Sequence, residues 1–149
     1  MNRRVLGGTL IAAVGIAATA RADAPKPHRL VMHVDINDAG VMELALGNIA
    51  NAIAYFAEKH QLVSVELVAN GPGYNMLRDS SPVAAKIAEL HKAHPGVVFS
   101  ACQNSRRGIA AHEGKKPEQI IELAEATDVP AGIARLMELQ ELGWSYVKV

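Results

Sequence analysis

Short apolar runs alternate along the chain with longer segments in which apolar and polar residues are mixed. Such runs are typical of strands, and they lie at residues 30–36, 62–69, 97–102 and 145–149. The segments between them predict helices at residues 38–60, 82–94, 104–112 and 130–143.

Capping signals mark where two of these helices begin. Asp38 is an N-cap residue for the first helix, and Ser81 followed by Pro82 predicts an N-cap and a first helical position for the second. In the first helix, apolar side chains recur at spacings of three and four residues. They predict its buried stripe, which consists of Met42, Leu46, Ile49, Ile53 and Phe56.

Residues 120–129 fit two structures. Glu122 to Ala126 favour a helix by propensity, whereas the order of the elements requires a strand. With a strand there, strands and helices alternate through a single domain, which predicts a mostly parallel sheet covered on both faces. We therefore expect an α/β fold, a flavodoxin-like three-layer α/β/α sandwich with a mostly parallel five-stranded sheet.

The first residues have the parts of a secretory signal in order. Arg3 and Arg4 precede an apolar stretch over residues 5–18, and residues 20–22 fit the A-x-A cleavage pattern. The sequence thus predicts a signal peptide over residues 1–22, a leader over 23–29 and one domain over 30–149. The apolar stretch is shorter than the roughly 20 residues that span a bilayer; an uncleaved anchor is the alternative. We expect a periplasmic protein that is off the membrane after cleavage, exported by the general or the twin-arginine route.

Charge excludes one class of partner. The chain carries 15 basic and 15 acidic residues, and cleavage removes three arginines to leave 12 against 15, a net charge of −3. No basic stripe remains, so nucleic-acid binding has no electrostatic basis.

Cys102 is the residue that points most directly to chemistry. It is the only cysteine, which excludes an internal disulfide and a C-x-x-C dithiol. It ends a predicted strand just before a predicted helix, whose N-terminal N–H groups favour the thiolate, and we expect Arg106 and Arg107 to add to this effect. A reactive role requires the thiol to be open to solvent. In the alternative, Cys102 shares one side of its strand with Val98 and Ser100 and is packed under a helix.

Polar and flexible residues follow three predicted strands, at residues 35–38, 70–75 and 102–105. Ligands of a parallel sheet bind beyond the carboxyl ends of its strands. We therefore expect a pocket beside Cys102 formed by His33, Asp35, Asn70, Gly71, Gly73, Tyr74, Gln103 and Asn104. The glycine loop lacks the spacing of a phosphate motif, so it either offers N–H groups to an anion or is only a turn. His33 also fits a core histidine with satisfied hydrogen bonds. The spacing of the histidines does not indicate a metal site, and we expect no metal and no cofactor.

Two asparagines interrupt the apolar pattern of the first helix. Asn48 and Asn51 lie one turn apart on a stripe with Leu44 and Tyr55. Such a stripe suggests hydrogen bonds to loops or a contact between subunits, and simple exposure to water explains it equally well.

Several fragments, in this order and spacing, resemble the DsrE/DsrF-like family of sulfur-relay proteins and their relatives. The fragments are His33-Val34-Asp35, Asn48 with Asn51, Val68 to Gly71, Ala101 to Ser105, and Val129 to Leu136 running into Leu139 to Val147. The resemblance implies a five-stranded flavodoxin-like fold with a strand near residues 122–129. It also implies homo-oligomers, commonly trimers or hexamers. In the relay members, a cysteine at the position of Cys102 accepts sulfur as a persulfide and passes it on.

The leading hypothesis is therefore a periplasmic sulfur-handling protein in which Cys102 relays sulfane sulfur from a donor protein or to an acceptor protein. The alternative is a non-catalytic module of the same fold that binds a small ligand or assembles into oligomers. A third possibility is a redox sensor that forms an intermolecular disulfide through Cys102.

Overall fold

The computed structural model describes residues 27–149, so the predicted signal peptide and most of the leader lie outside the described residues. Five strands form one sheet: β1 (His28–Val34), β2 (Val63–Ala69), β3 (Val98–Cys102), β4 (Ala126–Val129) and β5 (Ser145–Lys148). All neighbouring strands are parallel, in the order β4-β3-β2-β1-β5. The predicted three-layer sandwich is confirmed, although the strand order differs from the 2-1-3-4-5 order of flavodoxin itself.

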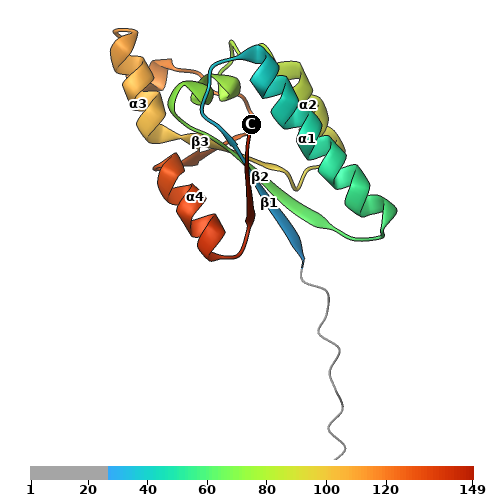
Figure 1. Ribbon diagram of the computed structural model, residues 1–149. Coiled ribbons are helices and arrows are strands. Elements are labelled where there is room, and N and C mark those ends of the chain that lie inside the picture. Colours follow the sequence, from blue (N-terminus) through green and yellow to red (C-terminus); the bar gives the residue numbers. More distant parts are fainter. Residues whose placement is uncertain (1–26) are drawn as a thin grey trace, which may run out of the picture.

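Helices occupy both faces of this sheet (Figure 1). The α-helices are α1 (Ala39–Glu58), α2 (Ala84–Ala93), α3 (Gln103–His112) and α4 (Gly132–Glu141). Two short 3-10 helices, η1 (Gly71–Leu77) and η2 (Pro117–Gln119), lie in the connections after β2 and α3.

The order of the strands decides which helix covers which face. From β1 to β4, each connection moves to the next strand in the same direction, so right-handed crossovers place α1, α2 and α3 on one face. The connection from β4 to β5 returns across the sheet in the opposite direction and places α4 on the other face. Figure 1 shows this division, with α1 and α2 on one side of the strands and α4 on the other.

Two hydrophobic clusters match these two layers. The larger joins side chains of β1, β2 and β3 to α1, α2 and α3, and it includes Met32, Leu67 and Phe99. The smaller joins Val31 and Val68 to α4. Because α4 is alone on its face, β3 is incompletely covered there, and Val98 is 38% exposed although its strand is internal.

The predicted boundaries hold for the first helix but not for the second. The Asp38 side chain accepts a hydrogen bond from the Val41 N–H at 2.9 Å, which confirms it as the N-cap of α1. In contrast, α2 begins at Ala84, so the prediction that Ser81 caps it is wrong. The Ser81 hydroxyl accepts instead from the Val83 N–H at 3.3 Å, and this local turn delays the start of the helix.

The ambiguous segment contains a short strand. β4 covers only Ala126–Val129, and the residues before it are irregular. Glu122 forms an isolated antiparallel bridge with Arg78, and the Leu123 N–H donates to the Leu77 carbonyl at 2.9 Å. These tertiary contacts override the helix propensity of the segment, because they use backbone groups that a helix would need.

Candidate functional site

The carboxyl ends of β3 and β4 form the point at which the chain changes sides. The connections that follow β1, β2 and β3 lead to one face of the sheet, and the connection after β4 leads to the other. In open α/β sheets, ligands bind in the crevice that opens at such a switch point. Cys102, the last residue of β3, is paired in register with Val129, the last residue of β4. The cysteine therefore lies at the switch point.

Two helix N-termini meet at the Cys102 sulfur. Cys102 is the N-cap residue of α3, and its Sγ accepts a hydrogen bond at 3.1 Å from the N–H of Gly132, the first residue of α4. A Cβ on Gly132 would lie 2.8 Å from the Asn70 Cβ and 3.2 Å from the Cys102 Cβ. Only glycine lets α4 begin this close to the sulfur.

Hydrogen-bond donors favour the thiolate form of Cys102. Burial is the largest single influence and raises the pKa of the thiol. The Ser105 hydroxyl and the backbone N–H groups of Gly132, Ser105 and Asn104 together outweigh it, so the pKa lies below its ordinary value. These groups are the free donors of the first turns of α3 and α4.

The thiol is nevertheless covered. Cys102 is only 4% exposed, so the expectation of a thiol open to solvent is wrong. The reason is the start of α4, which lies over the end of β3 and supplies both the covering atoms and the Gly132 hydrogen bond. Donation to the sulfur and burial of the sulfur therefore have the same structural cause.

Ser105 lies in the polar segment 102–105 singled out from the sequence, but it was not among the predicted pocket residues. Its Oγ accepts a hydrogen bond from the Gly71 N–H at 2.7 Å, and its hydroxyl donates toward Cys102. Ser105 thereby connects η1 to the sulfur. The signal in the sequence was its position three residues after Cys102, which places both on one side of the first helical turn. Gly132 was also missed; its signal was a glycine at the predicted start of the last helix.

Of the predicted pocket residues, Asn70, Gly71 and Asn104 lie next to Cys102. Asn70 meets the start of α4, Gly71 binds Ser105, and the Asn104 backbone N–H is directed to the sulfur. The Asn104 side chain accepts from Arg107. The prediction that Arg107 acts on the thiolate is not supported, because its guanidinium is held by this amide.

His33 is held by two hydrogen bonds on the α4 side of the sheet. Its Nδ1 is 2.7 Å from the Tyr146 hydroxyl, and its Nε2 is 2.8 Å from the Asn70 Oδ1. The Asn70 oxygen only accepts, so Nε2 donates to it. His33 thus fits the alternative of a satisfied core histidine, and Asn70 and Gly132 lie between it and Cys102.

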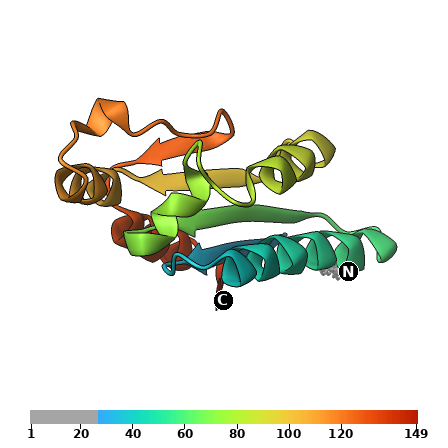
Figure 2. The same cartoon turned by 90° about the horizontal axis from the view of Figure 1, so that it is seen from above.

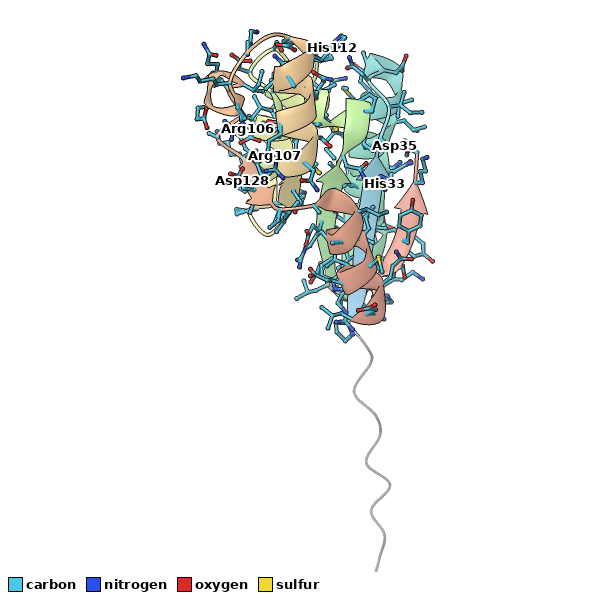
Figure 3. All side chains as sticks on the ribbon, turned by 90° about the vertical axis from the view of Figure 1, so that its left-hand side faces the viewer. His33, Asp35, Arg106, Arg107, His112 and Asp128 are labelled. Atoms are coloured by element: carbon cyan, nitrogen blue, oxygen red, sulfur yellow. The ribbon has the colours of Figure 1, made fainter. Side chains whose placement is uncertain are left out.

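Asp35 and Gly73 lie at the β1 end of the site. The Asp35 Oδ2 is 2.6 Å from the Lys148 Nζ, and this hydrogen bond holds the pKa of Asp35 below its usual range. A Cβ on Gly73 would lie 2.3 Å from the Val34 carbonyl oxygen, so η1 crosses the end of β1 only because this residue is glycine. Figure 3 shows His33 and Asp35 on the opposite side of α3 from Arg106 and Asp128.

Tyr74 and Gln103 belong to a separate polar network beside β4. The Tyr74 hydroxyl donates to Glu122 at 2.6 Å, and the Gln103 Nε2 donates to Glu122 and to Asp128, each at 2.9 Å. Burial and then Glu122 raise the pKa of Tyr74. These two side chains bind Glu122 and Asp128, and they hold this segment against η1 and α3.

Arg106 belongs to the same network, contrary to the expectation that it assists the thiolate. Its guanidinium donates to the carbonyl oxygens of Pro117 at 2.9 Å and Ile120 at 2.7 Å, and it lies 3.3 Å from the Glu122 carboxylate. The Arg106 guanidinium therefore binds carbonyl and carboxylate oxygens rather than the Cys102 sulfur, which already accepts hydrogen bonds from several other donors.

Two cavities flank the cysteine. One, of about 470 Å³, lies between η1 and α3 and is lined in part by Gly71, Pro72, Ser105 and His112. The other, of about 330 Å³, lies on the α4 face, where Ser100, Val129 and Arg135 contribute to its lining. Cys102 lines neither cavity, but Ser105 separates it from the first and its register partner Val129 borders the second.

An ion pair between buried Glu66 and partly exposed Arg135 forms one wall of the smaller cavity. Glu66 of β2 accepts two hydrogen bonds from Arg135 of α4, both at 2.7 Å, and a third from the Ser100 hydroxyl at 2.6 Å. These partners compensate the burial of the Glu66 charge and fix α4 over the sheet. Among residues 27–149, no group of three or more His, Cys, Asp and Glu side chains is arranged to hold a metal ion.

Comparison with known proteins supports the fold. No protein-family model and no curated protein matches the chain. Among solved structures, the chain is similar to the protein of unknown function MTH1491 from Methanobacterium thermoautotrophicum, with 28% sequence identity and a TM-score of 0.67. The match covers 82% of this chain and 99% of that chain. Nearly the whole of that protein therefore corresponds to the domain described above.

Proposed function

We propose that the protein handles sulfane sulfur, with Cys102 as the acceptor and carrier of the sulfur atom. The observation that carries this proposal is the Gly132 N–H donating to the Cys102 Sγ at the switch point, in a set of donors that lowers the pKa of the thiol. A cysteine that only fills space needs no such donors, because its thiol is a weak hydrogen-bonding group. A thiolate is the nucleophilic form of cysteine.

The proposed exchange is balanced in atoms and electrons. The Cys102 thiolate attacks the outer sulfur of a persulfide or polysulfide donor, written R–S–S⁻. A new sulfur–sulfur bond forms at Cys102, the bond in the donor breaks, and R–S⁻ leaves with the electron pair and takes a proton from water. Attack by an acceptor thiolate on the outer sulfur of the Cys102 persulfide reverses the exchange, so no cofactor is required.

Burial sets a condition on this exchange. With Cys102 at 4% exposure, a donor reaches the sulfur only when the start of α4 or the first turn of α3 moves aside. Export to the periplasm, a homo-oligomeric state and a donor or acceptor protein are predictions that accompany this proposal, and they rest on the sequence and on the resemblance to the DsrE/DsrF-like family.

The test is to incubate the purified chain with inorganic polysulfide and measure its intact mass. We expect a gain of one sulfur atom, located on Cys102 by peptide mapping and removed by dithiothreitol. The Cys102→Ser variant should gain nothing. If Cys102 stays unmodified under conditions that load a known sulfur-relay protein, the proposal is wrong.

The burial of Cys102 favours a second candidate, a non-catalytic binding or assembly module in which the thiol is only packed. This candidate predicts that the thiol of the folded protein resists alkylation and that Cys102→Ser leaves assembly intact. A redox sensor predicts instead a disulfide-linked dimer that disappears with reductant.

A further inference from the structure

The cavity of about 330 Å³ on the α4 face leads toward the Cys102 sulfur. Val98, Ser100 and Cys102 are alternate residues of β3, so their side chains lie on the same face of the strand, and the first two line the cavity. Cys102 is the next position in this row. The connection from β4 to α4 separates the two, because Ala131 lines the cavity and the next residue, Gly132, donates to the sulfur.

This cavity exists because α4 covers only part of its face of the sheet. The helix packs on Val31 of β1 and Val68 of β2, and Figure 2 shows it beside these strands and away from β4 at the other edge. The cavity occupies the remaining part of the face, over β3 and β4. Its volume lies at the lower end of the roughly 300–1,000 Å³ that is typical of small-molecule sites. The space therefore suits a small donor molecule.

Two charged side chains of α4 line the cavity and are only loosely paired with each other. The Arg135 Nη1 lies 3.6 Å from the Glu138 carboxylate, which is longer than a hydrogen bond, and the Glu138 side chain is 62% exposed. The Nε and Nη2 atoms of Arg135 are held by Glu66, whereas Nη1 is directed to Glu138. Exposed pairs of this kind contribute little to stability, so both groups can exchange partners at little cost.

A positive and a negative group side by side match a free amino acid, which carries an ammonium and a carboxylate on one carbon atom. Its carboxylate would bind the Arg135 Nη1, and its ammonium would bind Glu138. Val129 and Ala134 add apolar walls, which suit a soft, polarizable sulfur. Because Val129 is the register partner of Cys102, a side chain that lies over Val129 ends near the covered thiol. A cysteine within a protein offers neither charged group.

We propose that this cavity binds the persulfide of a free amino acid such as cysteine, with Arg135 and Glu138 as the residues that select it. This inference rests on the proposed function and names the donor as a small molecule. In the exchange described above, the group that leaves is then the thiolate of cysteine, which takes the electron pair and gains a proton from water. The start of α4 moves aside so that the outer sulfur of the donor reaches Cys102. The partner protein expected from the sequence is then the acceptor.

The test compares two persulfide donors that differ by the ammonium group. Cysteine persulfide carries it, and the persulfide of 3-mercaptopropionate has the same carbon chain and carboxylate without it. The rate of Cys102 persulfidation is measured by mass spectrometry over a range of donor concentrations for wild type, Glu138→Gln and Glu141→Gln. Glu141→Gln is the matched control, because Glu141 is also exposed on α4 but does not line the cavity. Loading of the wild type by inorganic polysulfide, which has no amino-acid part, tests the proposed function by itself.

We expect wild type and Glu141→Gln to reach half of the maximal rate at a concentration of cysteine persulfide about threefold lower than that of the mercaptopropionate donor, as one exposed ion pair implies. Glu138→Gln should lose this preference. If polysulfide loads Cys102 but the wild type shows no preference, or Glu138→Gln keeps it, this inference is overturned and the proposed function stands. If no donor loads Cys102, both are overturned.

A second variant tests the place of the site. Ala134→Leu fills the cavity from α4, and Ala88→Leu, at an exposed position of α2, is its control. Both changes keep a good helix former, and circular dichroism verifies that the variants are folded. Ala134→Leu should raise the half-saturating concentration of cysteine persulfide by about tenfold or more, as overpacking of a filled site implies. An Ala134→Leu variant that saturates like wild type overturns the assignment to this cavity.

Discussion

The substitution Gly132→Ala tests the electrostatic basis of the candidate site with a single methyl group. The added Cβ would lie 2.8 Å from the Asn70 Cβ, 3.2 Å from the Cys102 Cβ and 3.4 Å from Val68 Cγ1. Two of these three atoms are Cβ atoms fixed to the backbone, so no side-chain rotation relieves the clash. The start of α4 must therefore move, and the hydrogen bond from the Gly132 N–H to the sulfur lengthens or breaks.

Two magnitudes follow from this movement. Overpacking costs about 1–3 kcal/mol, and the better helix propensity of alanine returns at most about 1 kcal/mol, so we expect a net loss of stability of about 1–2 kcal/mol. A hydrogen bond to a charged group contributes about 1.5–3 kcal/mol. Its loss raises the pKa of Cys102 and lowers the ionisation constant of the thiol by about tenfold or more, because a tenfold change corresponds to about 1.4 kcal/mol.

The ultraviolet absorbance of the thiolate, followed as a function of pH, measures this pKa directly. Urea unfolding measures the stability of the same samples. Gly108→Ala is the control, because its Cβ meets no atom within 4 Å, and it should be as stable as wild type or more stable, with an unchanged Cys102 titration. If Gly132→Ala titrates like wild type, the helix N-terminus does not set the pKa of the thiol.

Three further substitutions test other hydrogen bonds of the site. Ser105→Ala removes the hydroxyl that donates toward Cys102, so the pKa of Cys102 should rise and stability should fall by about 1 kcal/mol; Ser105→Thr should restore both, and a titration unchanged in Ser105→Ala would contradict this role. Lys148→Met removes the partner that lowers the pKa of Asp35, and its stability relative to wild type should be lower at neutral pH. That difference should disappear as acid protonates Asp35, because a depressed carboxyl pKa stabilises the fold only above the ordinary value, and a difference that persists in acid would show another cause. Burial and then Glu122 raise the pKa of Asp128 in the folded protein. Ionisation of Asp128 therefore opposes folding once the pH rises above the ordinary pKa of an aspartate. Asp128→Asn should therefore be more stable than wild type at neutral pH and equal to it in acid, and urea unfolding at the two pH values would show the opposite order if the sign were wrong.

Most of the fold could be predicted from the sequence because its signals are local. The first three strands were placed within two residues of their observed starts and ends, since each is a short apolar run between polar residues. The first helix was placed equally well, because Asp38 caps it through its own side chain. The prediction of the second helix start failed because the Ser81 hydroxyl accepts from the Val83 N–H in a local turn that precedes the helix.

The site could be predicted only in part because half of it depends on strand order. That Cys102 ends a strand before a helix is a local feature, and it was found. Gly132 is 30 residues away and reaches the sulfur only because the chain turns back across the sheet after β4. Alternation of strands and helices does not specify that return. Arg106 was misplaced for a related reason, since its acceptors at Pro117 and Ile120 lie at the start and just after the end of η2, a short 3-10 helix that the sequence pattern did not predict.

The return of the chain across the sheet also links the acidity of Cys102 to its access. The Gly132 N–H that favours the thiolate belongs to the helix start that covers the sulfur, so a conformation that exposes the sulfur also withdraws a donor from it. Acidity and access should therefore change in opposite directions when this contact is weakened. In Gly132→Ala, a smaller fraction of the thiol is ionised at neutral pH, but each thiolate should be alkylated faster than in wild type. Alkylation per thiolate that is no faster than in wild type would mean that the sulfur is reached by another path, such as the cavity beside Ser105.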